Sequence, residues 1–241
     1  MKRYAPVLVL AYNRPLHLKN CLESLMKNKD FDKHQVIIAI DGPKSQSDVA
    51  VSLNVEYVAD EFSRKNTNTT VFKNQVNLGL GVSVIKNIEK VLSTNDAIIV
   101  VEDDLFLSPF FLKFCQFGLD TYINNKSVMA ISGFALPITN LKTSYFLRGA
   151  DCWGWATWKD RWSKFESNAN VLLDELKRRR LQRVFDLNYS YQYTKMLERQ
   201  ANGLSNSWAI RWHASTFLLG GLSRSEEHTS ELQSRQYLVC R

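Results

Sequence analysis

The sequence predicts an α/β fold in which helices flank a mostly parallel central sheet. Short apolar runs alternate along the chain with segments whose apolar residues recur at helical spacing, a pattern typical of parallel sheets. One apolar run, residues 98–101, reads as a strand buried on both faces, yet it ends in three adjacent carboxylates, Glu102, Asp103 and Asp104.

The first half of the chain alternates most regularly. Its expected strands are short and apolar, and its expected helices carry apolar residues every three or four positions. In chain order we expect a strand at 7–11, a helix over 16–26, a strand at 35–40, a helix over 49–62, a strand at 69–72, a helix over 82–92 and a strand at 96–101.

The second half is less regular. Residues 128–132 and 143–147 read as short strands, and an aromatic, irregular stretch with four tryptophans follows. Helices are expected over 169–184 and 189–201, and a strand or helix over 207–219. With no repeat, linker or clear boundary, we expect a single domain over residues 1–223.

Residues 224–241 are excluded from this expected fold. Their beginning, RSEEHTSELQS, resembles the translation of a common sequencing-library adapter, and the last four residues continue that match. We therefore expect an artefactual tail, and a natural chain that continued past about residue 223.

Composition narrows the class of protein. The chain has 241 residues, 45% hydrophobic and 23% charged, enough for an ample core. Cys21, Cys115 and Cys152 lack paired spacing, which favours buried free thiols in a reducing compartment. No apolar run approaches the roughly 18 residues that cross a bilayer, and the first apolar segment is too short for a signal peptide. These features predict a cytoplasmic protein.

The acid cluster Glu102, Asp103 and Asp104 is the strongest functional signal. Ligands of open α/β folds bind beyond the carboxyl ends of the strands. Hard carboxylate oxygens suit Mg²⁺ or Mn²⁺, so the expected ligand is a metal-bound phosphate. The alternative is that these acids only precede the helix start at Ser108 and Pro109.

Three further positions are candidates for the same crevice. Asp41 follows the strand at 35–40, where a carboxylate can accept a hydrogen bond from uracil or ribose, although Asp-Gly-Pro is also an ordinary turn. Arg14 would clamp a nucleotide or pair with a surface acid. Asn77 opens a glycine loop whose backbone N–H groups can face a ligand, although glycine before a helix is usually turn chemistry.

The aromatic stretch has two interpretations. Trp153 and Trp155 in DCWGWATW suit stacking on a sugar ring, but tryptophan is also core material. We favour the ligand site, because Trp153, Trp155 and Trp158 cannot share one face of a helix start. His213 has no second metal ligand at regular spacing, which favours a structural role.

The net charge of +7 comes largely from one expected helix. Lys177, Arg178, Arg179 and Arg180 favour a solvated helix face, and peripheral contact with the inner face of an anionic membrane is the alternative. We expect no nucleic-acid partner.

The segments AYNRP, IAIDGPK, NLGLG, VVEDDLFLSPFF and RGADCWGWATWKDRW make residues 1–223 resemble GT-A glycosyltransferases, specifically bacterial family 2-like enzymes related to N-acetylglucosaminyltransferase I. The resemblance implies a nucleotide-diphospho-sugar transferase fold, with a donor-binding half at 1–107 and an acceptor half at 108–223. It also implies inverting transfer of a hexose or N-acetylhexosamine, assisted by Mn²⁺ or Mg²⁺. The donor would be a nucleotide diphosphate sugar, preferentially a uridine one, and the acceptor a hydroxyl of a glycan, lipid-linked sugar or protein.

The resemblance also assigns residues. The acid cluster stands where these enzymes carry their DXD motif, so Asp104 would bind the metal, and Glu102 and Asp103 would support ribose and metal. Asp41 and Arg14 would hold the nucleoside.

An acceptor hydroxyl needs a carboxylate base, and Asp186, Asp151 and Glu198 are the candidates. We rank Asp186 first, because related enzymes carry the base near a helix start after the Trp-Gly-Trp segment. Two alternatives stay open: a nucleotidyltransferase that makes the nucleotide sugar, and a noncatalytic sugar- or nucleotide-binding module. The former normally opens with a glycine-rich loop and a lysine, and residues 12–15 offer neither.

Overall fold

The computed structural model describes residues 3–134 and 144–225. Its strands are β1 (Val7–Ala11), β2 (Val36–Ile40), β3 (Thr69–Lys73), β4 (Ala97–Glu102), β5 (Val128–Ser132), β6 (Tyr145–Arg148), β7 (Trp155–Trp158) and β8 (Leu222–Ser225). Its helices are α1 (Pro15–Met26), α2 (Val49–Lys65), α3 (Leu80–Thr94), α4 (Phe111–Thr121), α5 (Lys159–Trp162), α6 (Ala169–Arg178), α7 (Gln182–Phe185), α8 (Tyr193–Ala201) and α9 (Trp208–Leu218), with 3₁₀ turns at Phe31–Lys33 and Gln46–Asp48.

The strands described form a single sheet in the order β3-β2-β1-β4-β7-β5-β8-β6. β3, β2, β1 and β4 run parallel, and β8 runs parallel to β5. β7 lies antiparallel between β4 and β5, and β6 is antiparallel to β8. Among the described strands four of the seven pairings are therefore parallel, which confirms the expected α/β fold with a mostly parallel sheet.

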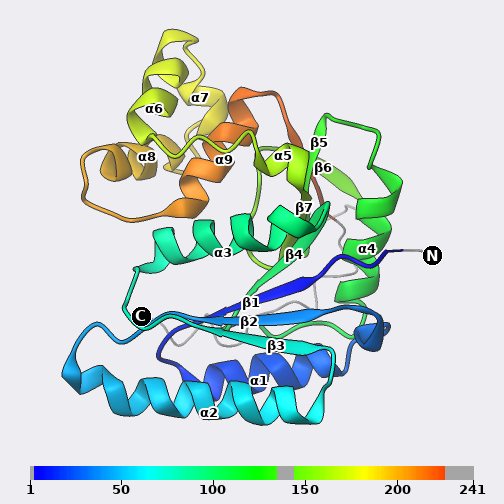
Figure 1. The fold of residues 1–241 in the computed structure, drawn as a ribbon. Coiled ribbons are helices and arrows are strands. Elements are labelled where there is room, and N and C mark those ends of the chain that lie inside the picture. The colour runs from blue at the N-terminus through cyan, green and yellow to red at the C-terminus, as the bar shows by residue number, and fades with distance from the viewer. Residues whose placement is uncertain (1–2, 135–143, 226–241) are drawn as a thin grey trace.

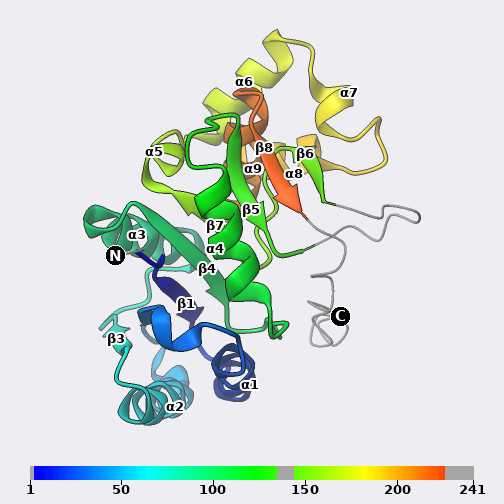
Figure 2. The ribbon, with the colours of Figure 1, turned by 90° about the vertical axis from the view of Figure 1, so that its right-hand side faces the viewer.

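The central strands are buried on both faces, so alternate residues enter different cores. Val7 and Val9 pack with residues of α1, α2 and α4, whereas Leu8 and Leu10 pack with residues of α3 and α9. Figure 1 shows α1 and α2 on one side of the sheet and α3 on the other, and Figure 2 shows α4 along β4 and β5. Continuous apolar runs are what strands covered on both faces require.

A third apolar cluster joins α6, α7, α8 and α9 into a helical layer at the top of Figure 1. Leu176, Phe185 and Leu197 from the first three of these helices meet Phe217 of α9. The other face of α9 supplies Trp208 and Trp212 to the core over the sheet. The helix α9 thus fixes this layer to the sheet.

The second half departs from expectation in the aromatic stretch and in the helix expected over 169–184, and agrees with it at residues 207–219 and near 143–147. The aromatic stretch contains a strand, β7, which we did not predict. The helix expected over 169–184 is broken into α6 and α7, with Arg180 between them at φ 55°, and residues 207–219 form the helix α9. The strand expected at 143–147 is β6, although residue 143 lies outside the described part.

The expected boundary at residue 223 falls inside a strand. Arg224 and Ser225 are buried and belong to β8, where Arg224 pairs with Ile131 of β5 and with Phe146 of β6. The fold therefore includes two residues that we had assigned to the tail. The remainder of that tail, 226–241, lies outside the described residues.

In residues 3–134 and 144–225, no helix combines the length and the hydrophobicity that crossing a membrane requires. The three cysteines of this part, Cys21, Cys115 and Cys152, are buried free thiols, as expected.

Candidate active site

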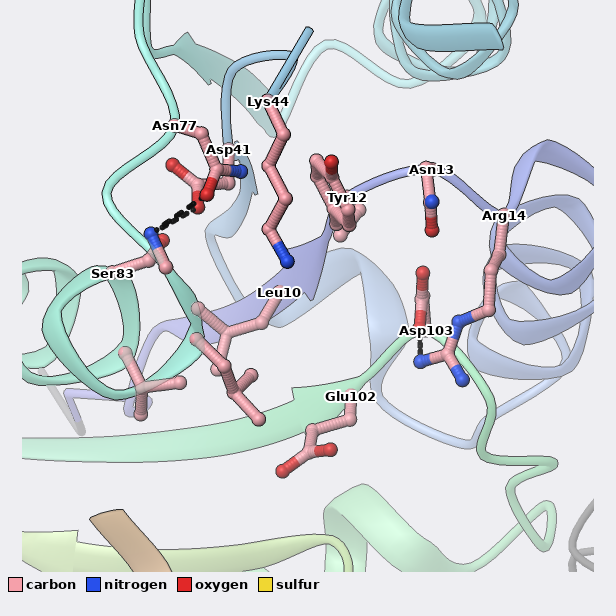
Figure 3. A pocket seen from close by; sticks show the side chains of 14 residues that line it. Leu10, Tyr12, Asn13, Arg14, Asp41, Lys44, Asn77, Ser83, Glu102 and Asp103 are labelled. Carbon is pink, nitrogen blue, oxygen red and sulfur yellow. Dashed lines mark hydrogen bonds and ion pairs between the residues drawn. The ribbon is translucent and has the colours of Figure 1, made fainter. Parts of the chain in front are cut away.

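The carboxyl ends of β1, β2 and β4 meet at one edge of the sheet. The Asp41 N–H donates to the Ala11 carbonyl at 2.9 Å, and the Asp103 N–H donates to the Leu10 carbonyl at 3.0 Å. A cavity of about 270 Å³, which we call the edge cavity, opens there (Figure 3). Its polar lining consists of Tyr12, Asn13, Arg14, Asp41, Lys44, Asn77, Ser83, Glu102 and Asp103. The structure thus gathers five of the candidate residues in one crevice.

Arg14 is the cation of the acid cluster. Its Nη2 contacts Asp103 Oδ1, and its Nη1 lies 3.2 Å from Asp104 Oδ2. Pro15 begins α1 directly after it, and the fixed φ of proline suits a first helical position. Of the two sequence-based interpretations, the ion pair is the one seen, but with acids of the cluster instead of a surface acid. Figure 3 shows the guanidinium against Asp103 at the cavity wall.

Burial perturbs the two acids that line the edge cavity. It raises the pKa of Glu102 to about 7, and the charges of Asp104 and Asp103 add to the rise. It also raises the pKa of Asp103 to about 6, against the opposing effect of Arg14. Asp103 Oδ2 is buried without a hydrogen-bond partner. A buried acceptor without a partner is destabilising, so a cationic or hydrogen-donating ligand would be favoured here.

The donor set of the cluster fits a divalent cation that arrives with its ligand. In the described residues, no three His, Cys, Asp or Glu side chains form a group that could hold a metal by themselves. Mg²⁺, however, keeps several waters and usually binds through one or two carboxylates plus substrate phosphates. Asp103, with its free Oδ2, and Asp104 supply such a pair. The guanidinium of Arg14 stands between them and would have to move.

Asp41 fastens the glycine loop to the end of β2. Its Oδ1 accepts from the Leu78 N–H at 2.9 Å and from Asn74 Nδ2 at 3.2 Å, and its Oδ2 accepts from the Gly79 N–H at 3.0 Å. A carboxylate oxygen can accept two hydrogen bonds, so Oδ2 retains capacity for a ligand donor. The residue therefore positions the loop and faces the cavity as well.

Asn77 is engaged within the same loop. Its Nδ2 donates to the Gly42 carbonyl at 2.7 Å, and its Oδ1 accepts from the Gly79 N–H at 3.1 Å. A Cβ on Gly42 would lie 2.5 Å from the Val76 carbonyl carbon, so only glycine permits this approach of the two loops. Asn77 lines the cavity mainly as a brace between the loops.

Lys44 and Tyr12 line the edge cavity but were missed by sequence reasoning. In Figure 3 the ammonium group of Lys44 reaches toward the middle of the cavity, and it lies 5.6 Å from the centre of the Tyr12 ring. The Tyr12 hydroxyl donates to Asp48 Oδ2 at 3.1 Å. A lysine three residues after Asp41 was the available signal, but the sequence does not show that this loop turns back over the cavity.

The three base candidates occupy different environments. Asp151 is partly buried, accepts from the Trp153 N–H at 3.1 Å, and has a pKa raised by burial. Burial, followed by the charges of Asp151 and Glu102, also raises the pKa of the Cys152 thiol. Trp155, four residues after Asp151, pairs with Val100 of β4, two residues before Glu102, so both acids lie toward the same edge of the sheet. Among the three candidates, Asp151 has the surroundings of a base near the acid cluster.

Asp186 and Glu198 do not fit that role. Asp186 is buried and accepts from the Thr194 N–H at 2.7 Å, in the first turn of α8, so its carboxylate holds a loop. Glu198 is half-buried and lies 3.5 Å from the Lys177 ammonium on the helical layer. Neither lines the edge cavity, so the structure favours Asp151 over Asp186, which we ranked first.

Trp155 and Trp153 differ in how far their side chains are buried. Trp155 is fully buried and its ring stacks on Trp208 at 5.7 Å, with Trp162 and Trp212 close by. No face of Trp155 is left for a sugar, so that expectation is corrected. Trp153 is 37% exposed, and its ring meets Phe134 edge-on, so it stays available to a ligand. His213 is half-buried, with Nδ1 2.9 Å from the Ala150 carbonyl, which fits the structural role that we expected.

The basic run on the helical layer is partly neutralised. Arg178 and Arg179 both pair with Glu175, and Arg179 Nη1 also donates to the Leu218 carbonyl at 2.8 Å. Lys177 faces Glu198. Three of the four basic side chains thus have local partners, which supports the solvated-face interpretation.

Residues 7–116 match the model of a family described as Glycosyl transferase family 2, a segment that contains every residue of the edge cavity. No curated protein matches the chain. The crystal structure of S. aureus TarS 1-349 covers 92% of this chain at 14% identity and a TM-score of 0.46, over 57% of its own length. The complexes of TarS 1-349 with UDP and UDP-GlcNAc each cover 58% of this chain at 18% identity and a TM-score of 0.40, over 40% and 39% of their length. The chain thus spans less than two thirds of these structures, and likeness this distant does not bear on function.

Proposed function

Because residues 7–116 match glycosyl transferase family 2, we propose that the chain is a metal-assisted, inverting glycosyltransferase that uses a nucleotide diphosphate sugar, with a uridine donor as first choice. The observation that carries the proposal is the acid cluster at the edge cavity. Glu102 and Asp103 end a buried strand there, opposite Asp41 and beside the cations Arg14 and Lys44. Acids and cations on facing walls suit a ligand that combines hydrogen-bond donors with phosphates.

Different residues of the edge cavity would bind different parts of the donor. Asp41 Oδ2, which accepts the Gly79 N–H and has capacity for a second hydrogen bond, would accept one from the base or ribose. Lys44 and a displaced Arg14 would contact the diphosphate, since both are cations at the wall of the cavity. Asp103 and Asp104 would hold a divalent cation, which when bound would stabilise the charge of the leaving diphosphate.

Asp151 would remove the proton from the acceptor hydroxyl. The raised pKa that burial gives this carboxyl suits a general base, because catalytic acids and bases work best with a pKa near the ambient pH. Its closeness to Glu102, through Cys152, would place it on the acceptor side of the donor. Direct attack by that hydroxyl on the anomeric carbon gives inversion.

The test is a calorimetric titration of UDP into the chain ended at Ser225, with Mn²⁺ and with a chelator. The variants are Asp104→Ala and, as a matched control, Asp96→Ala, which removes an exposed carboxylate at the opposite end of β4. We expect UDP binding that requires both the cation and Asp104 and is unchanged by the control. Equal binding with the chelator would overturn the role of the acid cluster.

A further inference from the structure

A second cavity of about 150 Å³ lies between the end of β5 and the helical layer. Its walls are mainly apolar and come from elements far apart in the sequence: Leu147 of β6, Val184 and Phe185 of α7, Leu187, Tyr193 of α8 and Phe217 of α9. We call it the second cavity. It shares no lining residue with the edge cavity, and neither the family match nor the resemblance assigns a role to it.

The walls of the second cavity are fixed by ring contacts. Phe185 meets Phe217 edge-on at 4.9 Å between ring centres, and Tyr193 stacks on His213 at 4.3 Å. His213 Nδ1 lies 2.9 Å from the Ala150 carbonyl, and burial lowers the pKa of this imidazole to about 4. The ring is therefore neutral at pH 7, and the cavity is preformed and apolar on this side.

Two charged side chains, Arg148 and Asp151, belong to the lining described for the second cavity. Arg148 is turned to the Phe217 ring and carbonyl, which its guanidinium contacts at 4.1 and 3.1 Å. Asp151 also lies on the segment that leads into β7, whose first residue, Trp155, pairs with Val100 of β4, two residues before Glu102. β4 and β5 end at the same sheet edge, separated only by β7. The two cavities are therefore neighbours, with Asp151 between them.

We infer that the second cavity binds an apolar group of the acceptor, a short alkyl chain or a single aromatic ring, while the reacting hydroxyl lies at Asp151. This inference rests on the proposed function. A cavity of roughly this volume lined by apolar side chains can hold benzene, which sets the size of the group. A second sugar would leave hydroxyl groups without partners on the apolar wall of Val184, Phe185 and Phe217, which is unfavourable, although Ser132, Ser223 and Ser225 add hydroxyl groups to the rest of the lining.

The test is a calorimetric titration of methyl, butyl, hexyl and octyl β-glucosides, each below its micellar concentration, with UDP titrated in parallel. Affinity should rise about fourfold for each methylene that becomes buried, and should level off near six carbons, where a cavity of this size is full. An affinity that does not change from methyl to hexyl would overturn the inference.

Two valine variants test whether the gain in affinity with alkyl chain length arises in the second cavity. Val184→Trp fills the mouth of the second cavity from a residue that is 49% exposed, and Val171→Trp places the same side chain on α6 at a residue that is 51% exposed and outside the cavity. We expect the dependence on chain length to disappear in the first variant and to persist in the second. Its persistence in Val184→Trp would place binding elsewhere and overturn the assignment.

The parallel UDP titration separates the two proposals. Alkyl binding without UDP binding would leave the cavity assignment in place and remove the proposed donor site. UDP binding with no dependence on the length of the alkyl chain would support the proposed donor site and overturn the cavity assignment.

Discussion

Arg14 links the two aspartates that a metal would need, so the cation and the guanidinium compete for the same oxygens. Replacing Arg14 by Met removes that competitor. We expect Mn²⁺ to bind Arg14→Met about tenfold more tightly than the parent chain without nucleotide, since hydrogen bonds to charged groups contribute about 1.5–3 kcal/mol. Paramagnetic resonance measures free Mn²⁺, at pH 8, above the pKa of about 6 to which burial raises Asp103.

Arg3→Met is the control, because Arg3 is an exposed arginine that pairs with Asp96 at 3.8 Å, at the far end of β4. It should leave Mn²⁺ affinity unchanged. Weaker Mn²⁺ binding in Arg14→Met would mean that Arg14 is needed to hold the acids in place and does not compete.

Asp151 and Asp186 differ in what their carboxylates do. Asp151→Asn should keep UDP affinity within about twofold and slow sugar transfer by about 10²–10⁴-fold, the usual loss for a general base. Asp186→Asn should instead leave sugar transfer unchanged and lower the free energy of unfolding by about 1 kcal/mol, because the Thr194 N–H would then donate to a neutral amide oxygen and hydrogen bonds to charged groups are stronger. Denaturant unfolding and transfer to the best-binding alkyl glucoside distinguish the two. A transfer defect confined to Asp186→Asn would reverse our assignment.

His213 makes stability depend on pH. Burial lowers its pKa from 6.5 to about 4 in the folded chain, so below pH 6.5 the unfolded chain takes up a proton that the folded chain refuses. This contribution to stability is complete above pH 6.5 and is lost as the pH falls toward 4. Relative to His213→Gln, the parent chain should lose about 3 kcal/mol of unfolding free energy over that range. Urea titrations at both pH values measure the difference, and parallel curves would show that the folded histidine takes up the proton too.

At the scale of elements, the contribution of β8 to stability depends on where the chain ends. Ser225 is buried, and its hydroxyl donates to the Phe134 carbonyl at 2.5 Å. A chain ended at Ser223 loses this bond and the pairing of Arg224 with β5 and β6. We expect its free energy of unfolding to be about 1–3 kcal/mol lower than that of a chain ended at Ser225. Urea unfolding of the two chains tests this, and equal midpoints would show that the end of β8 adds no stability.

Strands covered on both faces could be predicted from the sequence, and strands added late to the sheet could not. The expected strand at 35–40 is Val36–Ile40, because a run of apolar β-branched residues has few alternatives. β7 was missed because its four residues, WATW, show no strand pattern and become a strand only by pairing with β4 and β5. Non-local pairing of this kind leaves no local signal.

The same limit applied to the site. Asp41 and the acid cluster were found because they follow recognisable strands, and strand ends are where such folds bind ligands. The role of Asp186 could not be read from the sequence, because a carboxylate before a helix can serve as a base or satisfy a backbone N–H, and only the fold shows that it does the latter here. Lys44 was missed because its place depends on how a loop folds back over the cavity.

At the scale of the whole molecule, one sheet carries both cavities. The parallel strands β1, β2 and β4 present the edge cavity, and β5 and β8 lead to the second cavity under the helical layer. β7 joins the two groups of strands. A donor bound at one cavity and an acceptor at the other would therefore be aligned by a single rigid element, which suits a reaction that depends on orientation.

The tryptophans give this arrangement an optical consequence. All six lie after residue 150. Four of them form a cluster: Trp155 contacts Trp162, Trp208 and Trp212, and Trp162 contacts Trp212, with ring centres 5.1 to 5.9 Å apart. Indoles this close should couple and give a strong near-ultraviolet circular dichroism band, which is lost when side-chain packing is lost. Trp208→Phe should remove most of that band, and the exposed Trp153→Phe little of it; equal losses would contradict the coupling. Light absorbed by tryptophan would then report on the half of the chain that carries the second cavity, while the half that carries the edge cavity would be observed only through its tyrosines.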